Sequence, residues 1–241
     1  MSKPGYRRIL LKLSGEALAG TGGQGIDARV AARMAGEIAA VAREGIQVGL
    51  VIGGGNFFRG AVASELGMER VPADYMGMLA TVINGLAMQQ AIAAEQMPVR
   101  LMSAIEMPEV CEPFSLRRAL RHLEKGRVLI FSGGTGNPYF STDTAAVLRA
   151  LEIEADTIIK GTKVDGVFSA DPVVDSSARL YRHLSYNEVL SRKLEVMDFT
   201  AVTLCMENDL PLRVFNMNES GNLQRLLQGE EIGTTISGEE S

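Results

Sequence analysis

The stretch Val51-Ile52-Gly53-Gly54-Gly55-Asn56 joins the end of an apolar run to three consecutive glycines. The run itself, residues 46–52, has the length of a buried strand. Further short apolar runs occupy residues 9–13, 99–102, 128–131, 157–159 and 212–215. We predict that each run is a strand of a parallel sheet and that the three glycines follow the carboxyl end of the second one.

Helical patterns separate most of these strands. Starting at Asp27, which can cap a helix, apolar residues recur at helical spacing until Gly45 stops the pattern. These residues are Val30, Met34, Ile38 and Val41. A second helix is predicted from Pro72 toward Ala94. Its predicted apolar face consists of Met76, Leu79, Ile83 and Leu86.

Helix-start signals occur again in the second half of the chain. Ser115 and Asp198 are candidate caps, Thr142 begins a helix, and Ser185 forms a capping-box pattern with Glu188. Strands that alternate with helices predict the α/β class, here a three-layer αβα sandwich around a mostly parallel central sheet. No repeat or linker divides the sequence, so we expect residues 1–241 to form a single domain.

The composition argues against several classes of protein. Hydrophobic residues make up 46% and charged residues 22%, which predicts a chain folded throughout. The net charge of −5 disfavours general binding to nucleic acid or to an anionic membrane, because both need a basic surface. We see no signal-peptide pattern and no segment approaching the roughly 20 apolar residues of a membrane span. Cys111 and Cys205 lie far apart, so we expect reduced thiols and a cytoplasmic protein.

Glycine turns follow three of the predicted strands. They are Ser14-Gly15, Gly53-Gly54-Gly55 and Gly133-Gly134-Thr135-Gly136. Because the carboxyl ends of parallel strands meet at one edge, we expect the turns to converge there. Glycine lets backbone N–H groups approach phosphate oxygens, and a helix N-terminus near Thr142 adds positive charge. We therefore predict a site for several phosphates, with Lys12 and Arg59 as counter-charges.

Each feature also has an ordinary structural explanation. A single glycine turn is common loop chemistry, and Lys12 alone could be an exposed strand end. Phe168 by itself favours a hairpin core residue over a base-stacking one, and Asp171 before Pro172 favours a simple turn. Only the joint occurrence of the glycine turns and Lys12 at one sheet edge favours a functional site.

Another glycine-rich stretch, Gly20-Thr21-Gly22-Gly23-Gln24-Gly25, matches the dinucleotide-binding pattern G-x-G-x-x-G. We reject that interpretation because the pattern begins several residues after the strand, and the next strand ends in Gly53 rather than in an acidic residue. The stretch is interpreted as a flexible loop. The Walker A and protein-kinase signatures do not occur in the sequence.

Together these blocks resemble the amino acid kinase superfamily and, within it, the bacterial uridylate kinases, from Arg8 to about Ile236. The resemblance is carried by Lys12-Leu13-Ser14-Gly15-Glu16, Val51-Ile52-Gly53-Gly54-Gly55-Asn56 with Arg59-Gly60, Asp74-Tyr75-Met76-Gly77-Met78-Leu79-Ala80-Thr81, Gly134-Thr135-Gly136-Asn137-Pro138 and Thr162-Lys163-Val164-Asp165-Gly166-Val167. It implies an enzyme that transfers the γ-phosphoryl group of ATP to UMP, giving UDP and ADP in pyrimidine nucleotide biosynthesis. Mg²⁺ is expected to accompany ATP, but the resemblance assigns no metal ligands here.

The resemblance also implies which residues form the site. The expected catalytic residues are Lys12, Asp143 and Lys160, with Asp143 organising the lysines. ATP is expected at Lys12, Leu13, Ser14, Gly15, Gly55, Arg59, Thr162, Phe168 and Asp171. UMP is expected at Gly54, Asp74, Thr135, Gly136, Asn137, Pro138, Tyr139, Phe140, Ser141 and Thr142, mainly in the N-terminal part of the domain. Ser141 departs from relatives that carry two threonines here, but it keeps a hydroxyl donor.

Regulation and assembly are further implications of the resemblance. GTP and UTP are the expected effectors, and the family is a homohexamer. The allosteric candidates are Gly20, Thr21, Gly22, Gly23, Gln24 and Gly25, with Arg100 and Arg127 as further candidates for the same site. Two alternatives remain open: a related kinase that phosphorylates a carboxylate or carbamate, such as an aspartate or glutamate kinase, and a nucleotide sensor without turnover.

Overall fold

A single mixed sheet forms the centre of the computed structural model, which describes residues 5–58, 67–172, 174–175 and 177–238. In this part of the chain the sheet has nine strands in the order β4-β3-β5-β2-β1-β6-β8-β9-β7. The strands are β1 (Arg8–Leu13), β2 (Gln47–Ile52), β3 (Val99–Ser103), β4 (Glu112–Pro113), β5 (Val128–Ser132), β6 (Thr157–Thr162), β7 (His183–Ser185), β8 (Leu212–Asn216) and β9 (Thr234–Ser237). All neighbouring strands pair in parallel except β8 and β9, so β9 and β7 run opposite to the rest.

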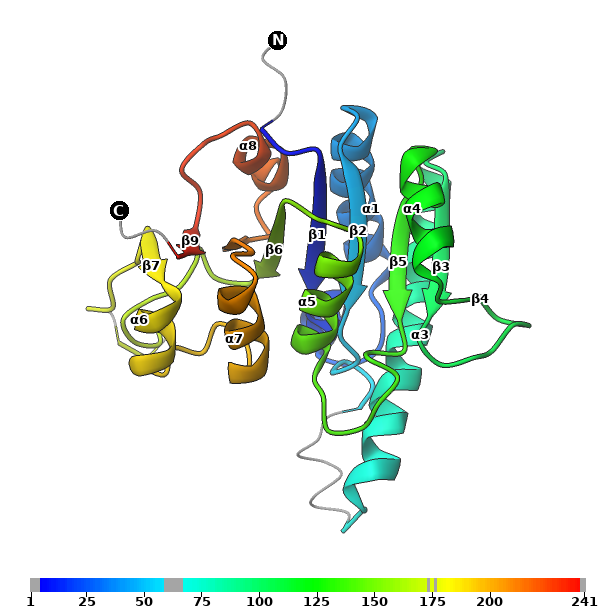
Figure 1. The fold of residues 1–241 in the computed structure, drawn as a ribbon, viewed down its shortest axis with the longest axis horizontal. Coiled ribbons are helices and arrows are strands. Elements are labelled where there is room, and N and C mark those ends of the chain that lie inside the picture. The colour runs from blue at the N-terminus through cyan, green and yellow to red at the C-terminus, as the bar shows by residue number, and fades with distance from the viewer. Residues whose placement is uncertain (1–4, 59–66, 173, 176, 239–241) are drawn as a thin grey trace.

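Helices cover both faces of the sheet (Figure 1). One hydrophobic cluster joins the sheet to α1 (Ala28–Arg43), α3 (Arg70–Ala94) and α8 (Asn222–Leu227). A second cluster joins the other face to α4 (Leu116–Glu124), α5 (Thr142–Glu152), α6 (Tyr186–Ser191) and α7 (Phe199–Glu207). Two short 3-10 helices, Gly15–Leu18 and Gly20–Gly22, follow β1. This arrangement confirms the predicted αβα sandwich.

Most predicted helix starts are confirmed by hydrogen bonds. The Asp27 carboxylate accepts from the first N–H groups of α1, and Asp198 accepts from Ala201 N in α7. Ser185 and Glu188 form the predicted capping box at α6. At α4, Ser115 occupies the cap position, but its side chain makes no capping hydrogen bond.

The longest helix, α3, corrects two expectations. It begins at Arg70 rather than at Pro72, and its predicted apolar face is mostly solvent-exposed: Met76, Leu79 and Ile83 are 42–48% exposed. Leu86 alone of that set packs partly against the core. The residues that α3 buries lie on another side of the helix and include Met78, Val82, Met88 and Ile92.

By length and composition, α3 is also apolar enough to cross a membrane, so the expectation that no segment qualifies was wrong on that criterion. In this fold, however, α3 packs on the sheet through Met88 and Ile92 as a core helix. Its N-terminal half extends beyond the carboxyl edge of the sheet (Figure 1). This extension places the first turns of α3 beside the glycine turns.

Candidate active site

Two lysines on adjacent strands meet one carboxylate at the carboxyl edge of the sheet. Lys12 and Lys160 are register partners in the parallel pair β1–β6. Each follows by two residues an apolar residue of the α5-side cluster, Leu10 or Ile158, so both side chains leave the sheet on that face. There Lys12 Nζ forms an ion pair with Asp143 Oδ1, and Lys160 Nζ lies 3.2 Å from Asp143 Oδ2.

Burial and charge act in opposite directions on this group. Burial favours the neutral carboxyl of Asp143, but attraction and hydrogen bonds from Lys12 and Lys160 outweigh it and hold its pKa below the ordinary 3.8. Burial lowers the pKa of Lys160; Asp143 opposes this shift and Lys12 adds to it. The carboxylate is therefore ionised at neutral pH and holds two cations side by side that would otherwise repel each other.

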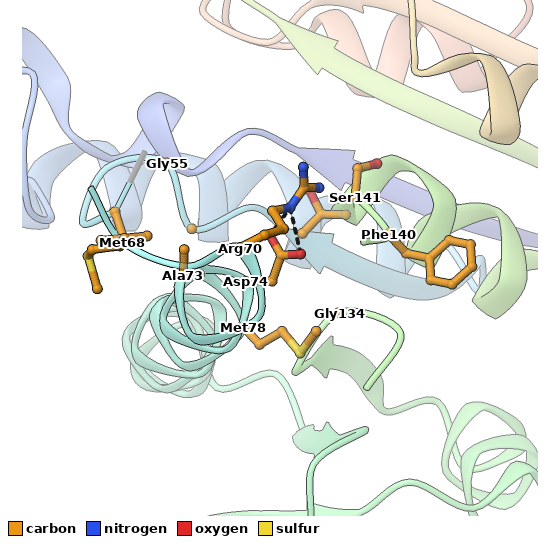
Figure 2. Close-up of a pocket in the computed structure, with 13 residues that line it drawn as sticks. Gly55, Met68, Arg70, Ala73, Asp74, Met78, Gly134, Phe140 and Ser141 are labelled. Carbon is orange, nitrogen blue, oxygen red and sulfur yellow. Dashed lines mark hydrogen bonds and ion pairs between the residues drawn. The ribbon is translucent and has the colours of Figure 1, made fainter. Parts of the chain in front are cut away.

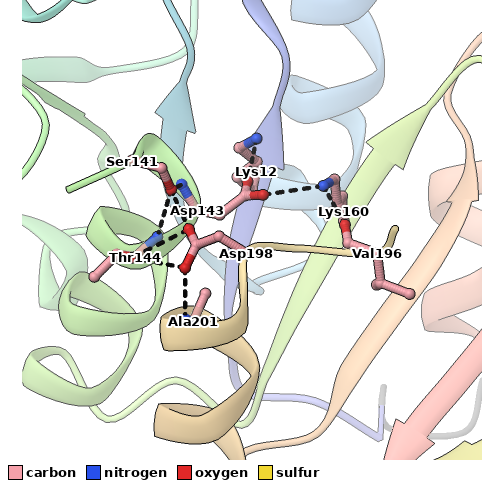
Figure 3. A network of polar contacts seen from close by, with 8 residues as sticks. All are labelled: Lys12, Ser141, Asp143, Thr144, Lys160, Val196, Asp198 and Ala201. Atoms are coloured by element: carbon pink, nitrogen blue, oxygen red, sulfur yellow. Dashed lines mark hydrogen bonds and ion pairs between the residues drawn. The ribbon is translucent and has the colours of Figure 1, made fainter. Parts of the chain in front are cut away.

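The first turn of α5 carries Asp143 and is fixed by its cap. Ser141 Oγ accepts from Asp143 N at 2.9 Å and from Thr144 N at 3.2 Å. Ser141 in turn donates to Asp198 at the start of α7, and Lys160 Nζ also donates to the carbonyl of Val196 (Figure 3). The lysine–carboxylate group is thus held from both α5 and the segment before α7.

Close backbone packing explains the glycines after β2. A Cβ atom on Gly54 would lie 2.6 Å from Gly77 O and 2.8 Å from Ala80 Cβ, both in α3. A Cβ atom on Gly15 would lie 2.5 Å from Gly53 O, so the turns after β1 and β2 also touch. Glycine is required at these positions because any side chain would separate the turns from each other and from α3.

Two buried asparagines support the same turn. Asn56 and Asn84 exchange side-chain amide hydrogen bonds of 2.9 and 2.7 Å. Asn84 also donates to Gly53 O, and Asn56 donates to Gly25 O, which ties the loop before α1 to the turn. Sequence reasoning missed Asn84, whose only signal is an amide in an otherwise apolar stretch of α3.

A cavity of about 640 Å³ opens beside these turns (Figure 2). Gly54, Gly55, Phe58, Met68, Arg70, Ala73, Asp74, Gly77, Met78, Gly134, Phe140, Ser141 and Thr142 line it. The lining combines glycine turns, the start of α5 and the first turns of α3. Of the residues predicted to bind UMP, it includes Gly54, Asp74, Phe140, Ser141 and Thr142.

One basic residue of this cavity was not predicted. Arg70 Nε donates to both carboxylate oxygens of Asp74, at 2.9 and 2.8 Å, and its guanidinium lies 5.5 Å from the centre of the Tyr139 ring. Tyr139 N also donates to Asp74, at 2.7 Å. The sequence signal for Arg70 was its position four residues before Asp74, which is the spacing of an ion pair on a helix.

Known proteins share the sequence and the fold of this chain. The model of the amino acid kinase family matches residues 7–216. A uridylate kinase from Aeromonas salmonicida is 58% identical over 97% of this chain and 96% of its own length, and one from Methylococcus capsulatus is 56% identical over 98% and 99%. The crystal structure of UMP kinase from Bacillus anthracis has a TM-score of 0.95 at 41% identity, covering 98% of this chain and 97% of its own.

The chain belongs to the amino acid kinase family. Its full-length similarity to uridylate kinases, in sequence and in fold, makes it a phosphotransferase of that branch of the family.

In this amino acid kinase, the stretch from Thr135 to Tyr139 lies outside the residues that line the cavity. Thr135 Oγ1 donates to Asn137 O and accepts from Asn137 N, which closes a local turn. Tyr139 is 67% exposed, and its φ is +72°. The predicted UMP contacts of Thr135, Gly136, Asn137, Pro138 and Tyr139 therefore remain predictions.

Most of the predicted adenine-nucleotide residues lie at or after the ends of β1 and β6, whereas Gly55 is in the turn after β2 and lines the cavity. Ser14 and Gly15 begin the turn after β1, whereas the Leu13 side chain is fully buried in the core. Thr162 Oγ1 donates to Val164 O at 2.7 Å and to Phe215 O at 3.1 Å.

Phe168 and Asp171 follow on the excursion after β6. Phe168 pairs with Leu180 in an isolated antiparallel bridge, which agrees with the hairpin interpretation of this residue. The carbonyl of Asp171 accepts from Val174 N and Asp175 N, which confirms the turn. Arg59 lies outside the described residues.

The allosteric candidates separate into two groups. Residues 20–25 follow β1 at the carboxyl edge, where Gly25 N donates to Asn56 O. Arg100, the second residue of β3, and Arg127, which precedes β5, lie at the opposite edge. There Arg100 pairs with Glu112, and Arg127 bonds to His122, which bonds to Glu112. The allosteric role of both groups therefore remains a prediction.

Metal ligands are not apparent from clustering. Among the described residues, no group of three or more His, Cys, Asp or Glu side chains is arranged to hold a metal ion.

Proposed function

We propose that this chain transfers the γ-phosphoryl group of Mg-ATP to UMP, giving UDP and ADP. The observation that carries the proposal is the pair of lysines held on Asp143 next to the glycine-lined cavity. The names of its relatives, uridylate kinase and UMP kinase, favour UMP as the acceptor.

In the proposed reaction an oxygen of the UMP phosphate bonds to the γ-phosphorus while the bond from that phosphorus to the β–γ bridging oxygen breaks. A phosphate monoester is already ionised, so the site needs no strong base. It has to hold two polyanions in line and stabilise the charge on the transferring group, which cations and backbone N–H groups do. Lys12 and Lys160 would supply this charge, with Mg²⁺ bound to the ATP phosphates.

The two nucleotides would approach from different halves of one domain. UMP would occupy the cavity between α3 and the start of α5, with its phosphate toward Gly54 and its ribose toward Asp74. ATP would lie along the ends of β1 and β6, near Thr162, Phe168 and Asp171. Their phosphates would then meet over Lys12, at the edge between the halves.

An acceptor assay tests the proposal. Purified wild-type protein is given Mg-ATP with UMP, CMP, aspartate or glutamate, and ADP and the phosphorylated product are both measured. We expect UDP with UMP and much slower turnover with the others. ADP formation with aspartate or glutamate but not UMP would favour a carboxylate kinase instead. Binding of UMP without UDP formation would favour a nucleotide sensor.

The same proposal includes regulation and assembly. GTP and UTP are the proposed effectors, to be added in the same assay, and a homohexamer in the cytoplasm is the proposed form. The exposed apolar face of α3, formed by Tyr75, Met76, Leu79 and Ile83, supports association because exposed apolar patches often mark protein–protein contacts. Sedimentation of the wild type checks the oligomeric state.

A further inference from the structure

We propose that Asp198 is a positioning residue for phosphoryl transfer, a role that rests on the proposed function. It would hold the start of α5, and with it Asp143, at a fixed distance from Lys160. Asp198 is not adjacent to the glycine turns in sequence, and nothing in its local pattern beyond a helix cap distinguishes it.

The contacts of Asp198 exceed those of a helix cap. One oxygen, Oδ1, accepts from Ala201 N at 2.9 Å and so caps α7. The other, Oδ2, accepts from the hydroxyl of Ser141, and Thr144 Oγ1 lies 3.2 Å from both oxygens. Serine, threonine or asparagine cap helices about as well as aspartate does. Capping alone therefore does not explain a carboxylate that also accepts from two hydroxyls of another helix.

These hydroxyls connect Asp198 to the catalytic group (Figure 3). The Ser141 hydroxyl donates a hydrogen bond to Asp198, and its oxygen accepts one from Asp143 N at 2.9 Å. Thr144 is buried and directly follows Asp143 on α5. The orientation of the first turn of α5, and hence of the Asp143 carboxylate, is thus set by Asp198.

The same short segment also reaches the second lysine. Val196, two residues before Asp198, accepts a hydrogen bond from Lys160 Nζ through its carbonyl. The negative charge of Asp198 favours the protonated form of Lys160, in the same direction as Asp143. Residues 196–198 therefore support both members of the Asp143–Lys160 pair. Asp198 supports Asp143 through α5, and Val196 contacts Lys160 directly.

Small displacements of this pair should affect the chemistry more than the binding of ATP. A misplacement of about 1 Å can reduce a rate by about 10²-fold. Asp198→Ser keeps a good cap for α7 but is too short to reach Ser141. We expect its kcat to fall about 10- to 100-fold, while its KM for ATP changes less than about threefold.

A double-mutant cycle separates positioning from general stability. Thr144→Val removes one hydroxyl donor and leaves the α7 cap intact. If Asp198 acts through α5, the double variant should lose little more kcat than Asp198→Ser alone, because both changes break one connection. Ser185→Ala, which removes the cap of α6 at the far end of the sheet, is the matched control and should keep wild-type kcat.

The outcomes are distinct. Wild-type kcat in a folded Asp198→Ser variant, or kcat losses that simply multiply in the double variant, would overturn the positioning role and leave the kinase proposal intact. A wild type that forms no UDP would overturn both. If Asp198→Ser does not fold, the isosteric Asp198→Asn replaces it in the same cycle, with urea unfolding as the check on folding.

Discussion

The role of Lys12 could be predicted only in part from the sequence. A charged residue inside an apolar strand has a desolvation cost, and the structure shows how this cost is met: Lys12 is 6% exposed and is paired with Asp143. The strand register then places Lys160 beside it. Lys12 is held in place but shares the Asp143 carboxylate with Lys160, so its ammonium group can also bind an incoming phosphate.

Removal of Lys12 gives a direct prediction at this scale. Lys12→Ala should lower kcat by roughly 10²-fold or more, as expected for the loss of a charge-stabilising donor. The fold should persist because Lys160 still pairs with Asp143. Steady-state kinetics with UMP and Mg-ATP, alongside circular dichroism, measure both effects. Lys125→Ala, an exposed lysine after α4, is the control. Wild-type turnover in Lys12→Ala would remove Lys12 from the mechanism.

Other residues could not be predicted because their roles depend on neighbours distant in sequence. Arg70 contacts Asp74 and Tyr139, and Asn84 forms hydrogen bonds with Asn56. Asp198 was predicted as a cap, but its contacts with α5 depend on the packing of α5 against α7. A sequence pattern can identify a cap, whereas the second partner of the same side chain appears only in the fold.

At the scale of elements, the contact between α3 and the turn after β2 builds one wall of the cavity. Gly54→Ala should destabilise the protein by about 1–3 kcal/mol, because the new methyl group would clash with the backbone of Gly77, which cannot move aside. It should also raise the KM for UMP, since α3 carries Asp74. Urea unfolding and UMP titration measure the two effects.

The matched control, Gly36→Ala, should change the stability of the protein in the opposite direction. Gly36 lies within α1, and an added Cβ atom there meets no atom within 4 Å. Gly36→Ala should therefore stabilise the protein by up to about 1 kcal/mol through helix propensity and leave the KM for UMP unchanged. Equal behaviour of the two variants would contradict the proposed packing role of Gly54.

Element prediction succeeded where the pattern was strong. The central strands and the caps of α1, α6 and α7 were predicted from apolar runs and capping residues. The strands β4, β7 and β9 were missed because they are two to four residues long. The exposed face of α3 was misassigned because the helix has only Asp74 as a charge between residues 71 and 94. Periodicity cannot choose a buried face on a helix that is apolar nearly all round.

At the scale of the whole molecule, strand direction determines where the chemistry occurs. Strands β1, β2, β5 and β6 are parallel, so their carboxyl ends bring together Lys12, the glycine turns and Lys160 from distant parts of the sequence. The sequence predicted this convergence from the αβ alternation alone. It could not predict the reversed strands β9 and β7, which extend the sheet beyond β8.

The central claim is that this edge holds two nucleotides with their phosphates facing each other over Lys12. A crystal structure with UMP and a non-hydrolysable ATP analogue tests it most directly. We predict the UMP phosphate beside Gly54 in the cavity and Lys12 Nζ within about 4 Å of a β- or γ-phosphate oxygen. A triphosphate bound elsewhere, with Lys12 contacting only Asp143, would contradict the account.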